Sequence, residues 1–529
     1  MRPFRQARRA TLVTATLCVA ALVTTSGGAV AKADPSQQSR DFRKAVTVRG
    51  VAQHLDALQA VADANNGNRA SGTPGYAASR DYVVQKLRAA GYRPMVQTFQ
   101  FDYYRENAPA QLAQLTPEAT TYVASTDITT MEFSASGSAS GTVVAVDTAF
   151  TAINDSTSGC EAADFAGFPS GAIALMQRGT CDFSVKVANA ATAGASAALI
   201  FNRGTNDSDG DNRGPVQGTL GTPARIAAVG VSFAVGVDLG SPAGTTARVV
   251  TDTVSEGRPT YNVIAETRKG NPDNVVMSGA HLDSVEAGPG INDNASGSAA
   301  LLEIAEEMAQ FKEVKKVKNK VRFAWWGAEE SGLLGATHYV DDLKATNPDA
   351  LGDIALYLNY DMVGSPNFVR FVYDGDNTLG TTDVTAPEGS AQIERLFTRY
   401  FNSQRLPTEP TAFDGRSDYG PFIDNGVPAG GLFTGAEGVK TAAQAAKYGG
   451  TAGVAYDACY HEACDTRANI SMTGLDQMVD AAAHATYVLS RSTKAVNGKG
   501  SGNKSHKLGP SNDHRANRLA ARHEYAPAS

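Results

Sequence analysis

The alternation of strand-like and helix-like segments in the second half of the chain constrains the fold most. Runs rich in apolar residues lie at 274–280, 320–326 and 354–360, and segments with apolar residues at helical spacing lie between them at 298–310 and 333–343. Strands that alternate with helices in this way are typical of a mostly parallel sheet with helices on both faces. We therefore expect an α/β fold built on a mixed, mostly parallel sheet.

A stretch of different composition interrupts this pattern. Residues 106–257 are rich in Thr, Ser, Gly and Ala and carry only short strand-like runs. The remaining expected elements are helices at 51–62, 76–90 and 475–490 and an extended run at 93–101. A chain of 529 residues is too long for one ordinary domain. We expect residues 40–105 and 258–492 to form one domain, with 106–257 inserted into it as a β-rich domain.

Both ends of the chain have compositions typical of segments outside a folded domain. Residues 1–33 combine four arginines, a 13-residue apolar stretch and small residues that suit a cleavage site, which predicts a signal peptide and secretion. The Arg8-Arg9 pair leaves open whether export follows the general or the twin-arginine route. Residues 493–529 are polar and basic, and we expect them to form a disordered tail.

Cysteine usage agrees with an exported protein. Of five cysteines, Cys18 lies in the predicted signal, which leaves four in the mature chain. We expect these to form disulfides rather than free or metal-binding thiols, since the sequence contains no Cys-x-x-Cys pair. Local pairing, Cys160 with Cys181 and Cys459 with Cys464, is the simplest of the three connectivities.

The charge of the chain argues against some classes of partner. Its net charge is -7, and no Lys- or Arg-rich helix suggests binding to nucleic acid. No run after the predicted signal is long and apolar enough to span a membrane. We expect a globular monomer without stable membrane insertion.

Acidic and histidine residues follow three successive predicted strands at the point where each strand ends. His281 and Asp283 follow the first, Glu329 and Glu330 the second, and Asp361 the third. In open α/β sheets, ligands bind at the carboxyl ends of the strands. We therefore expect these side chains to converge on one crevice.

Two further residues can join this group. Asp293 lies in the loop GINDNASG after the first of these strands, and His461 lies in the short segment CYHEAC. Zinc accepts such a mixture of imidazoles and carboxylates, with three protein ligands per ion and an open position for water. A bridging carboxylate would hold two ions about 3.5–4 Å apart. The residues thus predict a hydrolytic site with two zinc ions.

The motifs that carry these residues resemble those of the secreted co-catalytic zinc aminopeptidases, a family that also includes the glutamate carboxypeptidases. The strings SGAHLDSV, GINDNASG, WWGAEESGLLGA, LNYDMVGS and YHEACD occur in the family's order over residues 278–465, and a weaker match covers 65–92. The resemblance implies the zinc exopeptidase fold. It also implies a metallo-aminopeptidase that acts on peptides or proteins with a free N-terminus and prefers large apolar N-terminal residues.

The resemblance also assigns the metal ligands. His281 and Asp361 would hold one zinc ion, Glu330 and His461 would hold the other, and Asp293 would bridge both. Every ligand position of the family pattern is present, so the resemblance implies an active enzyme.

Five other residues take roles from the same resemblance. Glu329 would be the general base, which passes the proton of the attacking water to the leaving amine. Asp283 would orient His281 through its second ring nitrogen. Tyr460 would hydrogen-bond the oxyanion, Arg416 would contact the substrate backbone, and Phe433 would line a pocket for the substrate side chain. For the last three, a packed aromatic or a surface ion pair is the alternative.

The inserted segment resembles the protease-associated domain over about 60 residues, through the string AIALMQRGTCDF, Lys186, Asn189 and Gly194. Domains of this kind cover a peptidase cleft or bind partners. Members of the aminopeptidase family can also bind calcium near a pair such as Asp476 and Asp480. The segment 44–47 lacks the acidic partner expected for that ion, so we interpret the pair as a solvated helix face.

Three other functions compete with the aminopeptidase. A carboxypeptidase on the same scaffold would need basic groups for a C-terminal carboxylate, and Arg416 alone is thin support for it. A non-catalytic binding protein would use the inserted domain as its working surface, and a glutaminyl cyclase would hold a single zinc ion. The complete ligand set argues against these last two.

Overall fold

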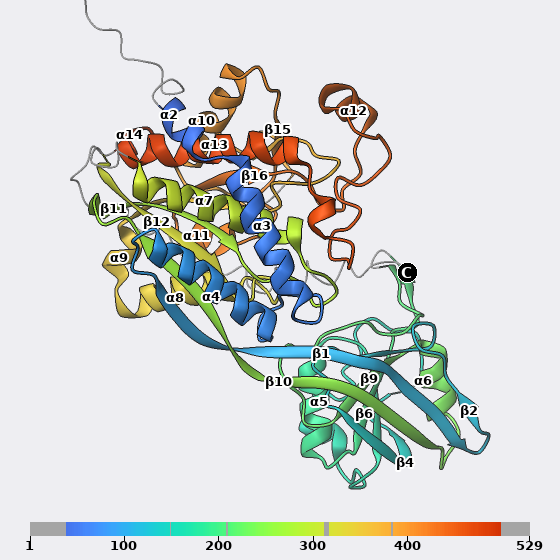
Figure 1. The fold of residues 1–529 in the computed structure, drawn as a ribbon. Helices are drawn as coiled ribbons and strands as arrows, with labels where there is room; N and C mark the ends of the chain where they lie inside the picture. The colour runs from blue at the N-terminus through green and yellow to red at the C-terminus, as the bar shows by residue number, and fades with distance from the viewer. Residues whose placement is uncertain (1–38, 149, 208–209, 312–316, 382–383, 499–529) are drawn as a thin grey trace, which may run out of the picture.

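Two lobes are joined by a long ribbon of two strands in the computed structural model (Figure 1). The structure describes residues 39–498, except 149, 208–209, 312–316 and 382–383. The predicted signal peptide at 1–33 and residues 499–529 of the predicted tail lie outside the described residues. Among the described residues, no helix has both the length and the hydrophobicity that a membrane span requires.

The larger lobe is a mixed sheet between layers of helices. Its strand order is β15-β14-β16-β13-β11-β12-β10, where β10 spans Thr246–Glu266. The four central strands β16, β13, β11 and β12 run parallel to one another, whereas β14 is antiparallel to β16 and β10 is antiparallel to β12. The strands are β11 (Asn271–His281), β12 (Asn319–Trp326), β13 (Ile354–Tyr360), β14 (Phe371–Tyr373), β15 (Glu409–Thr411) and β16 (Ala429–Phe433). The predicted mostly parallel α/β fold is confirmed.

Helices cover both faces of this sheet with separate hydrophobic cores. One core involves α2 (Arg40–Ala45), α3 (Val48–Asp63), α4 (Pro74–Ala89), α7 (Gly297–Gln310), α10 (Ser390–Ser403) and α13 (Met472–Arg491). The other involves α8 (Leu334–Thr346), α9 (Pro348–Gly352) and α11 (Tyr419–Asp424). Two short helices, α12 (Ala442–Tyr448) and α14 (Lys494–Asn497), complete the lobe. The sheet is covered on both sides, which is why β13 is buried at every residue.

Local sequence signals set the ends of the first helices. The hydroxyl of Thr47 accepts a hydrogen bond from the backbone of Gly50 and caps the start of α3. Pro74 begins α4, and Gly91 follows its end with a φ of 92°. The predicted helices at 51–62 and 76–90 therefore begin and end within a few residues of the observed ones.

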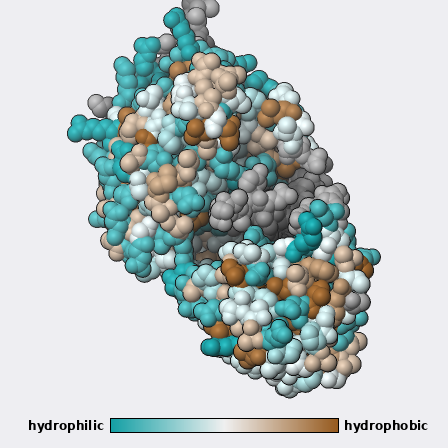
Figure 2. All heavy atoms as spheres, turned by 90° about the vertical axis from the view of Figure 1, so that its right-hand side faces the viewer, coloured by the Kyte–Doolittle hydropathy of each residue, from teal (hydrophilic) through white to brown (hydrophobic). Residues whose placement is uncertain are grey.

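The lobes are joined by β1 (Met95–Thr116) and β10 (Thr246–Glu266), which pair antiparallel along most of their length. One end of β10 pairs with β12 of the larger lobe, and its other end pairs with β4 (Gly137–Ala145) of the smaller lobe. In the side view the smaller lobe lies below the larger one (Figure 2). The predicted domain boundaries at 105/106 and 257/258 fall inside this ribbon, where both strands continue.

The smaller lobe is a sheet of order β4-β5-β6-β9-β3 with one helix on each face. Its elements are β2 (Thr120–Thr121), β3 (Ile128–Thr130), β4 (Gly137–Ala145), β5 (Ile173–Gln177), α5 (Phe183–Thr192), β6 (Ala197–Phe201), β7 (Asn206–Asp207), β8 (Gly210–Asp211), β9 (Ala227–Val231) and α6 (Phe233–Gly240). Alternate residues of β5 and β6 face the two cores, so both strands are buried throughout.

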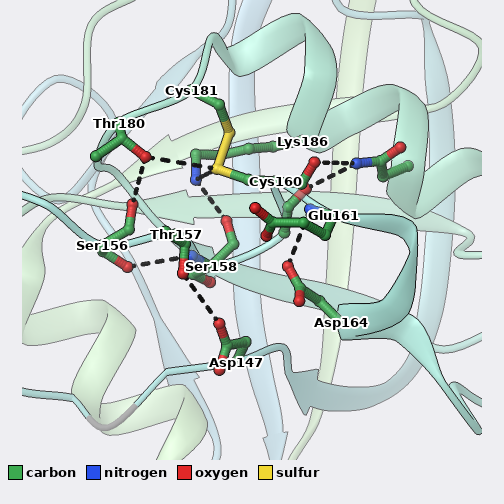
Figure 3. Close-up of a disulfide and its surroundings, with 12 residues drawn as sticks. Asp147, Ser156, Thr157, Ser158, Cys160, Glu161, Asp164, Thr180, Cys181 and Lys186 are labelled. Atoms are coloured by element: carbon green, nitrogen blue, oxygen red, sulfur yellow. Dashed lines mark hydrogen bonds between the residues drawn. A yellow bond between two sulfur atoms is a disulfide. The ribbon is translucent and has the colours of Figure 1, made fainter.

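A disulfide between Cys160 and Cys181 fastens the loop before α5 (Figure 3). The ammonium group of Lys186 donates to the carbonyl of Ser158 and lies 3.5 Å from Cys160 Sγ. Burial lowers the pKa of Lys186 to about 8. The second disulfide joins Cys459 to Cys464, so both predicted local pairings are confirmed.

The first residues of the predicted tail, from Thr493 to Asn497, are packed against the larger lobe. Thr493 is buried, and its hydroxyl accepts a hydrogen bond from Asn274 Nδ2 at 2.9 Å. Asn497 donates to Asn274 Oδ1 at 3.0 Å, and Val496 is buried in the core. The polar composition of this segment does not predict these contacts. Only Val496 packs in the core, and the other contacts are hydrogen bonds of amide side chains and a hydroxyl.

Candidate metal centre

The predicted side chains meet at the carboxyl ends of three adjacent parallel strands. His281 is the last residue of β11 and lies opposite Trp326 at the end of β12. Glu329 follows β12, and Asp361 follows β13, which pairs with β11 on its other side. The parallel register thus brings residues that are far apart in the sequence to one edge of the sheet.

Asp293 lies between the two histidines. Its Oδ1 is 3.1 Å from His281 Nε2, and its Oδ2 is 3.2 Å from His461 Nε2. Asp361 Oδ1 lies 3.3 Å from His281 Nε2, and Glu330 Oε2 lies 3.2 Å from His461 Nε2. The five residues therefore form two groups. His281 and Asp361 lie beside Oδ1 of Asp293, and His461 and Glu330 lie beside its Oδ2.

A network around Asp465 holds the loops of Asp293 and His461 together. The backbone N–H groups of Asn292 and Asp293 donate to the two carboxylate oxygens of Asp465, at 2.8 and 2.9 Å. Asp465 directly follows the Cys459–Cys464 disulfide, which closes the loop that carries His461. His461 itself has a φ of 60°, a conformation that is uncommon for residues other than glycine. These contacts fix His461 relative to Asp293 although the two are far apart in the sequence.

Asp283 connects His281 to Glu329. His281 Nδ1 lies 3.1 Å from the backbone carbonyl of Asp283 and 3.6 Å from its Oδ1. The backbone N–H of Glu329 donates to the same Oδ1 at 3.3 Å. Asp283 thus contacts the second ring nitrogen of His281, through its carbonyl more closely than through the carboxylate that the sequence suggested.

The donor set fits zinc. The four separations between histidine nitrogen and carboxylate oxygen are 3.1–3.3 Å. In a tetrahedral zinc site with metal bonds of about 2.0 Å, neighbouring ligand atoms lie about 3.3 Å apart, which matches these separations. Donation from His281 Nδ1–H to the Asp283 carbonyl leaves His281 Nε2 with a lone pair for a metal. Asp361 Oδ2 accepts from Ser417 Oγ at 2.5 Å, while its buried Oδ1 makes no hydrogen bond.

The electric field of the site also favours a cation. Burial alone would lower the pKa of His281, but the carboxylates of Asp361 and Glu329 outweigh it and raise that pKa well above its usual value. Burial raises the pKa of Glu329 well above its usual value, and the nearby Glu330 adds to the shift. A divalent ion would neutralise this concentration of negative charge.

A cavity of about 240 Å³ opens beside these residues. Its apolar wall consists of Met362, Phe371, Tyr373, Phe433 and Tyr456. Phe433 stacks on Phe371 with ring centroids 6.0 Å apart, so the structure places Phe433 in the wall of this cavity, as the sequence suggested.

Tyr460 and Arg416 form the polar rim of the cavity together with Glu437. The ring of Tyr460 stacks on His461 at 3.9 Å, and its hydroxyl accepts a hydrogen bond from Arg416 Nη2 at 3.1 Å. Burial raises the pKa of Tyr460 well above its usual value, so the phenol keeps its proton. Arg416 Nη1 donates to Glu437 at 2.6 Å. No sequence motif marks Glu437, because nothing near it in the chain identifies it as a partner of Arg416.

Arg69 is a second residue of the site that no sequence motif marks. Its guanidinium is fully buried and donates to the carbonyls of Leu282, Pro289 and Gly290. These carbonyls belong to the strand end that carries His281 and to the loop that leads to Asp293. Arg69 therefore fixes the distance between the chain segment that carries His281 and the loop that carries Asp293.

Replacing Arg69 with Met is expected to lower zinc affinity by about 10–100-fold, because the carbonyls it binds orient the loops of two ligands. Competition with a chromophoric chelator measures this affinity directly. Arg88→Met, on the exposed side of α4, is the matched control and should bind zinc as the wild type does. Equal affinity in both variants would contradict a positioning role for Arg69.

The Asp476–Asp480 pair on α13 has a different partner. Arg43 lies 3.1 Å from Asp480 Oδ2, and the hydroxyl of Tyr400 lies 3.3 Å from the same oxygen. A guanidinium therefore occupies the place beside Asp480 where a calcium ion would need further oxygen ligands. This contact supports the interpretation of the pair as a helix face.

Comparisons with known proteins show which family this chain resembles. The model of peptidase family M28 matches residues 262–486, and the model of the PA domain matches residues 139–239. An aminopeptidase of Pseudomonas aeruginosa is 50% identical over 84% of this chain and 81% of its own length. A probable leucine aminopeptidase 2 of Aspergillus fumigatus is 43% identical over 79% of each chain. The solved aminopeptidase from Aneurinibacillus sp. strain AM-1 aligns with a TM-score of 0.59 and 26% identity over 85% of this chain and 95% of that one.

Proposed function

This chain belongs to peptidase family M28, carries an inserted PA domain and is an aminopeptidase, and from that premise we propose that it works as a secreted, zinc-dependent enzyme with two zinc ions. The observation that carries the two-ion proposal is the position of Asp293, whose two oxygens each face a different histidine. One ion would be held by His281, Asp361 and Asp293, and the other by His461, Glu330 and Asp293.

Glu329 is the proposed general base. When bound, the zinc ions supply Lewis acidity that polarises the scissile carbonyl and makes water acidic enough to attack at neutral pH. Glu329 Oε2 lies 3.9 Å from His281 Nε2, beside the proposed metal ligands, where it can take the proton of the attacking water. It then delivers this proton to the nitrogen of the leaving amine. Tyr460 keeps its proton and can donate it in a hydrogen bond to the oxygen that gains charge.

The charge of the cavity supports cleavage at the N-terminus of a peptide. Three carboxylate residues that are not proposed zinc ligands line it, namely Glu329, Asp414 and Glu437. Among the described lining residues, Arg416 is the only arginine or lysine, and Glu437 lies 2.6 Å from it. Such a cavity attracts the ammonium of a free N-terminus and offers little to a C-terminal carboxylate.

The apolar wall suggests a preference for large apolar N-terminal residues such as leucine. Phe371, Phe433 and Tyr456 would surround that side chain. The fungal relative's name, leucine aminopeptidase, points the same way. Two disulfides and the predicted signal peptide support export, and we propose that residues 106–257 act as an accessory domain of a monomeric enzyme.

Acetylation of the substrate amine tests the proposed specificity. We expect leucine p-nitroanilide to be hydrolysed and N-acetyl-leucine p-nitroanilide to lose at least about 100-fold in kcat/KM, since the acetyl group removes the ammonium that the carboxylates attract. Release of p-nitroaniline measures both rates. Cleavage of N-blocked peptides from their C-terminal end would instead indicate a carboxypeptidase.

A further inference from the structure

A second group of a histidine and two carboxylates lies between α3 and α7, apart from the cavity. His54 Nε2 is 3.3 Å from Glu306 Oε2 and 3.6 Å from Glu303 Oε2. The side chain of His54 is 2% exposed, and that of Glu303 is 9% exposed. One ligand atom from each of the three residues lies within 4.8 Å of the others.

The remaining polar atoms of His54 and Glu303 are held by other partners. His54 Nδ1 lies 2.7 Å from the hydroxyl of Tyr82. Glu303 Oε1 accepts from the backbone N–H of Thr47 at 3.2 Å and from its hydroxyl at 3.4 Å. These contacts turn His54 Nε2 and Glu303 Oε2 toward each other, in the way that outer hydrogen bonds orient metal ligands.

Glu306 is oriented in the same way. Lys86 Nζ lies 3.5 Å from Glu306 Oε1, which leaves Oε2 facing His54. The buried His54 Nε2 makes no hydrogen bond to either carboxylate, although both are close. The imidazole nitrogen therefore faces two carboxylate oxygens with no hydrogen bond between them. The gap between these three atoms is small, and the carboxylates give it a negative potential.

One spacing, 3.3 Å from His54 Nε2 to Glu306 Oε2, falls in the range of the metal centre described above, and the spacing of 3.6 Å to Glu303 Oε2 is longer. There, histidine nitrogens lie 3.1–3.3 Å from the carboxylate oxygens that would share a zinc ion with them. Helix α3 also makes room for the glutamate at Gly50, where a Cβ would come within 2.0 Å of Glu303 Oε1. Glycine in a helix lowers stability relative to alanine, so the glycine that lets Glu303 approach α3 makes this helix less stable at Gly50.

We propose that His54 Nε2, Glu303 Oε2 and Glu306 Oε2 bind a further zinc ion, which ties α3 to α7. One imidazole and two carboxylates form a ligand set that zinc accepts, and the half-buried Glu306 side leaves room for a water as fourth ligand. The ion would fasten the N-terminal helices to α7, whose first turn directly follows the Asp293 loop.

Zinc content of the full mature chain tests the proposal. We expect His54→Gln and, separately, Glu306→Gln to retain about one zinc ion per chain fewer than the wild type after dialysis against metal-free buffer. Glu307→Gln, a neighbouring carboxylate on α7, is the matched control and should keep the wild-type content. Because the test compares variants, it does not depend on how many ions the catalytic centre holds.

A buried ion pair between a protonated His54 and the two glutamates is the competing explanation. It predicts equal zinc content in the wild type and in all three variants. It also predicts that a chelator lowers the Tm of the wild type and of His54→Gln equally. The zinc site predicts a smaller chelator-induced fall for His54→Gln, because that variant has one ion fewer to lose. It also predicts an anomalous peak at the zinc edge between His54 Nε2 and Glu306 Oε2 in crystals of the zinc-loaded protein, and absence of that peak would overturn the proposal.

Discussion

Replacing Glu329 with Gln is expected to lower kcat by about 10²–10⁴-fold while zinc content stays at the wild-type level. Glutamine keeps the shape of the side chain but cannot accept the proton of the attacking water. Because Glu329 is proposed as a base and not as a ligand, KM for leucine p-nitroanilide should change far less than kcat. Steady-state kinetics and metal analysis on the same preparation separate the two effects.

The matched control for this variant is Glu462→Gln. Glu462 is an exposed carboxylate next to His461, and its replacement should leave kcat near the wild-type value. A loss of zinc in Glu329→Gln would mean that Glu329 acts as a ligand. A kcat within a few-fold of the wild type would show that another group carries the proton.

Replacing Asp293 with Ala should remove about two zinc ions per chain and lower kcat/KM. Loss of a residue that only hydrogen-bonds a metal ligand costs about 10–100-fold, and we expect a larger fall for Asp293→Ala. Asp293 is the only residue whose oxygens face both His281 and His461 among the described residues, so its loss weakens both metal positions together. Metal analysis and p-nitroaniline release measure the two outcomes.

Readdition of zinc distinguishes metal loss from misfolding. Wild-type enzyme stripped with a chelator should regain activity when zinc is restored, whereas Asp293→Ala should not. Asp341→Ala, an exposed aspartate on α8, serves as the control and should keep both zinc and activity. If Asp293→Ala retained the full zinc content, the two ions could not share this carboxylate.

Local signals predicted most elements of the larger lobe well. The strand expected at 354–360 has these bounds in β13, and the helix expected at 475–490 lies inside α13. The long ribbon was only partly anticipated, because residues 104–109 of β1 have no buried side chain and so show no hydrophobic alternation. That stretch crosses from one lobe to the other, and its register comes from β10, more than 130 residues later.

The sequence by itself determined which chemistry is available. Histidines and carboxylates after successive strands, in the order of a known motif set, identify a zinc peptidase without coordinates. Only the tertiary structure decided how these groups face one another: that Asp293 points one oxygen at each histidine, that Arg69 bonds the carbonyls of two ligand loops, and that Glu437 binds Arg416. Strand and helix patterns are local and can be read along the chain. Contacts such as that of Arg69 with Ser284, 215 residues away, depend on how the packed elements meet, and no short stretch of sequence records them.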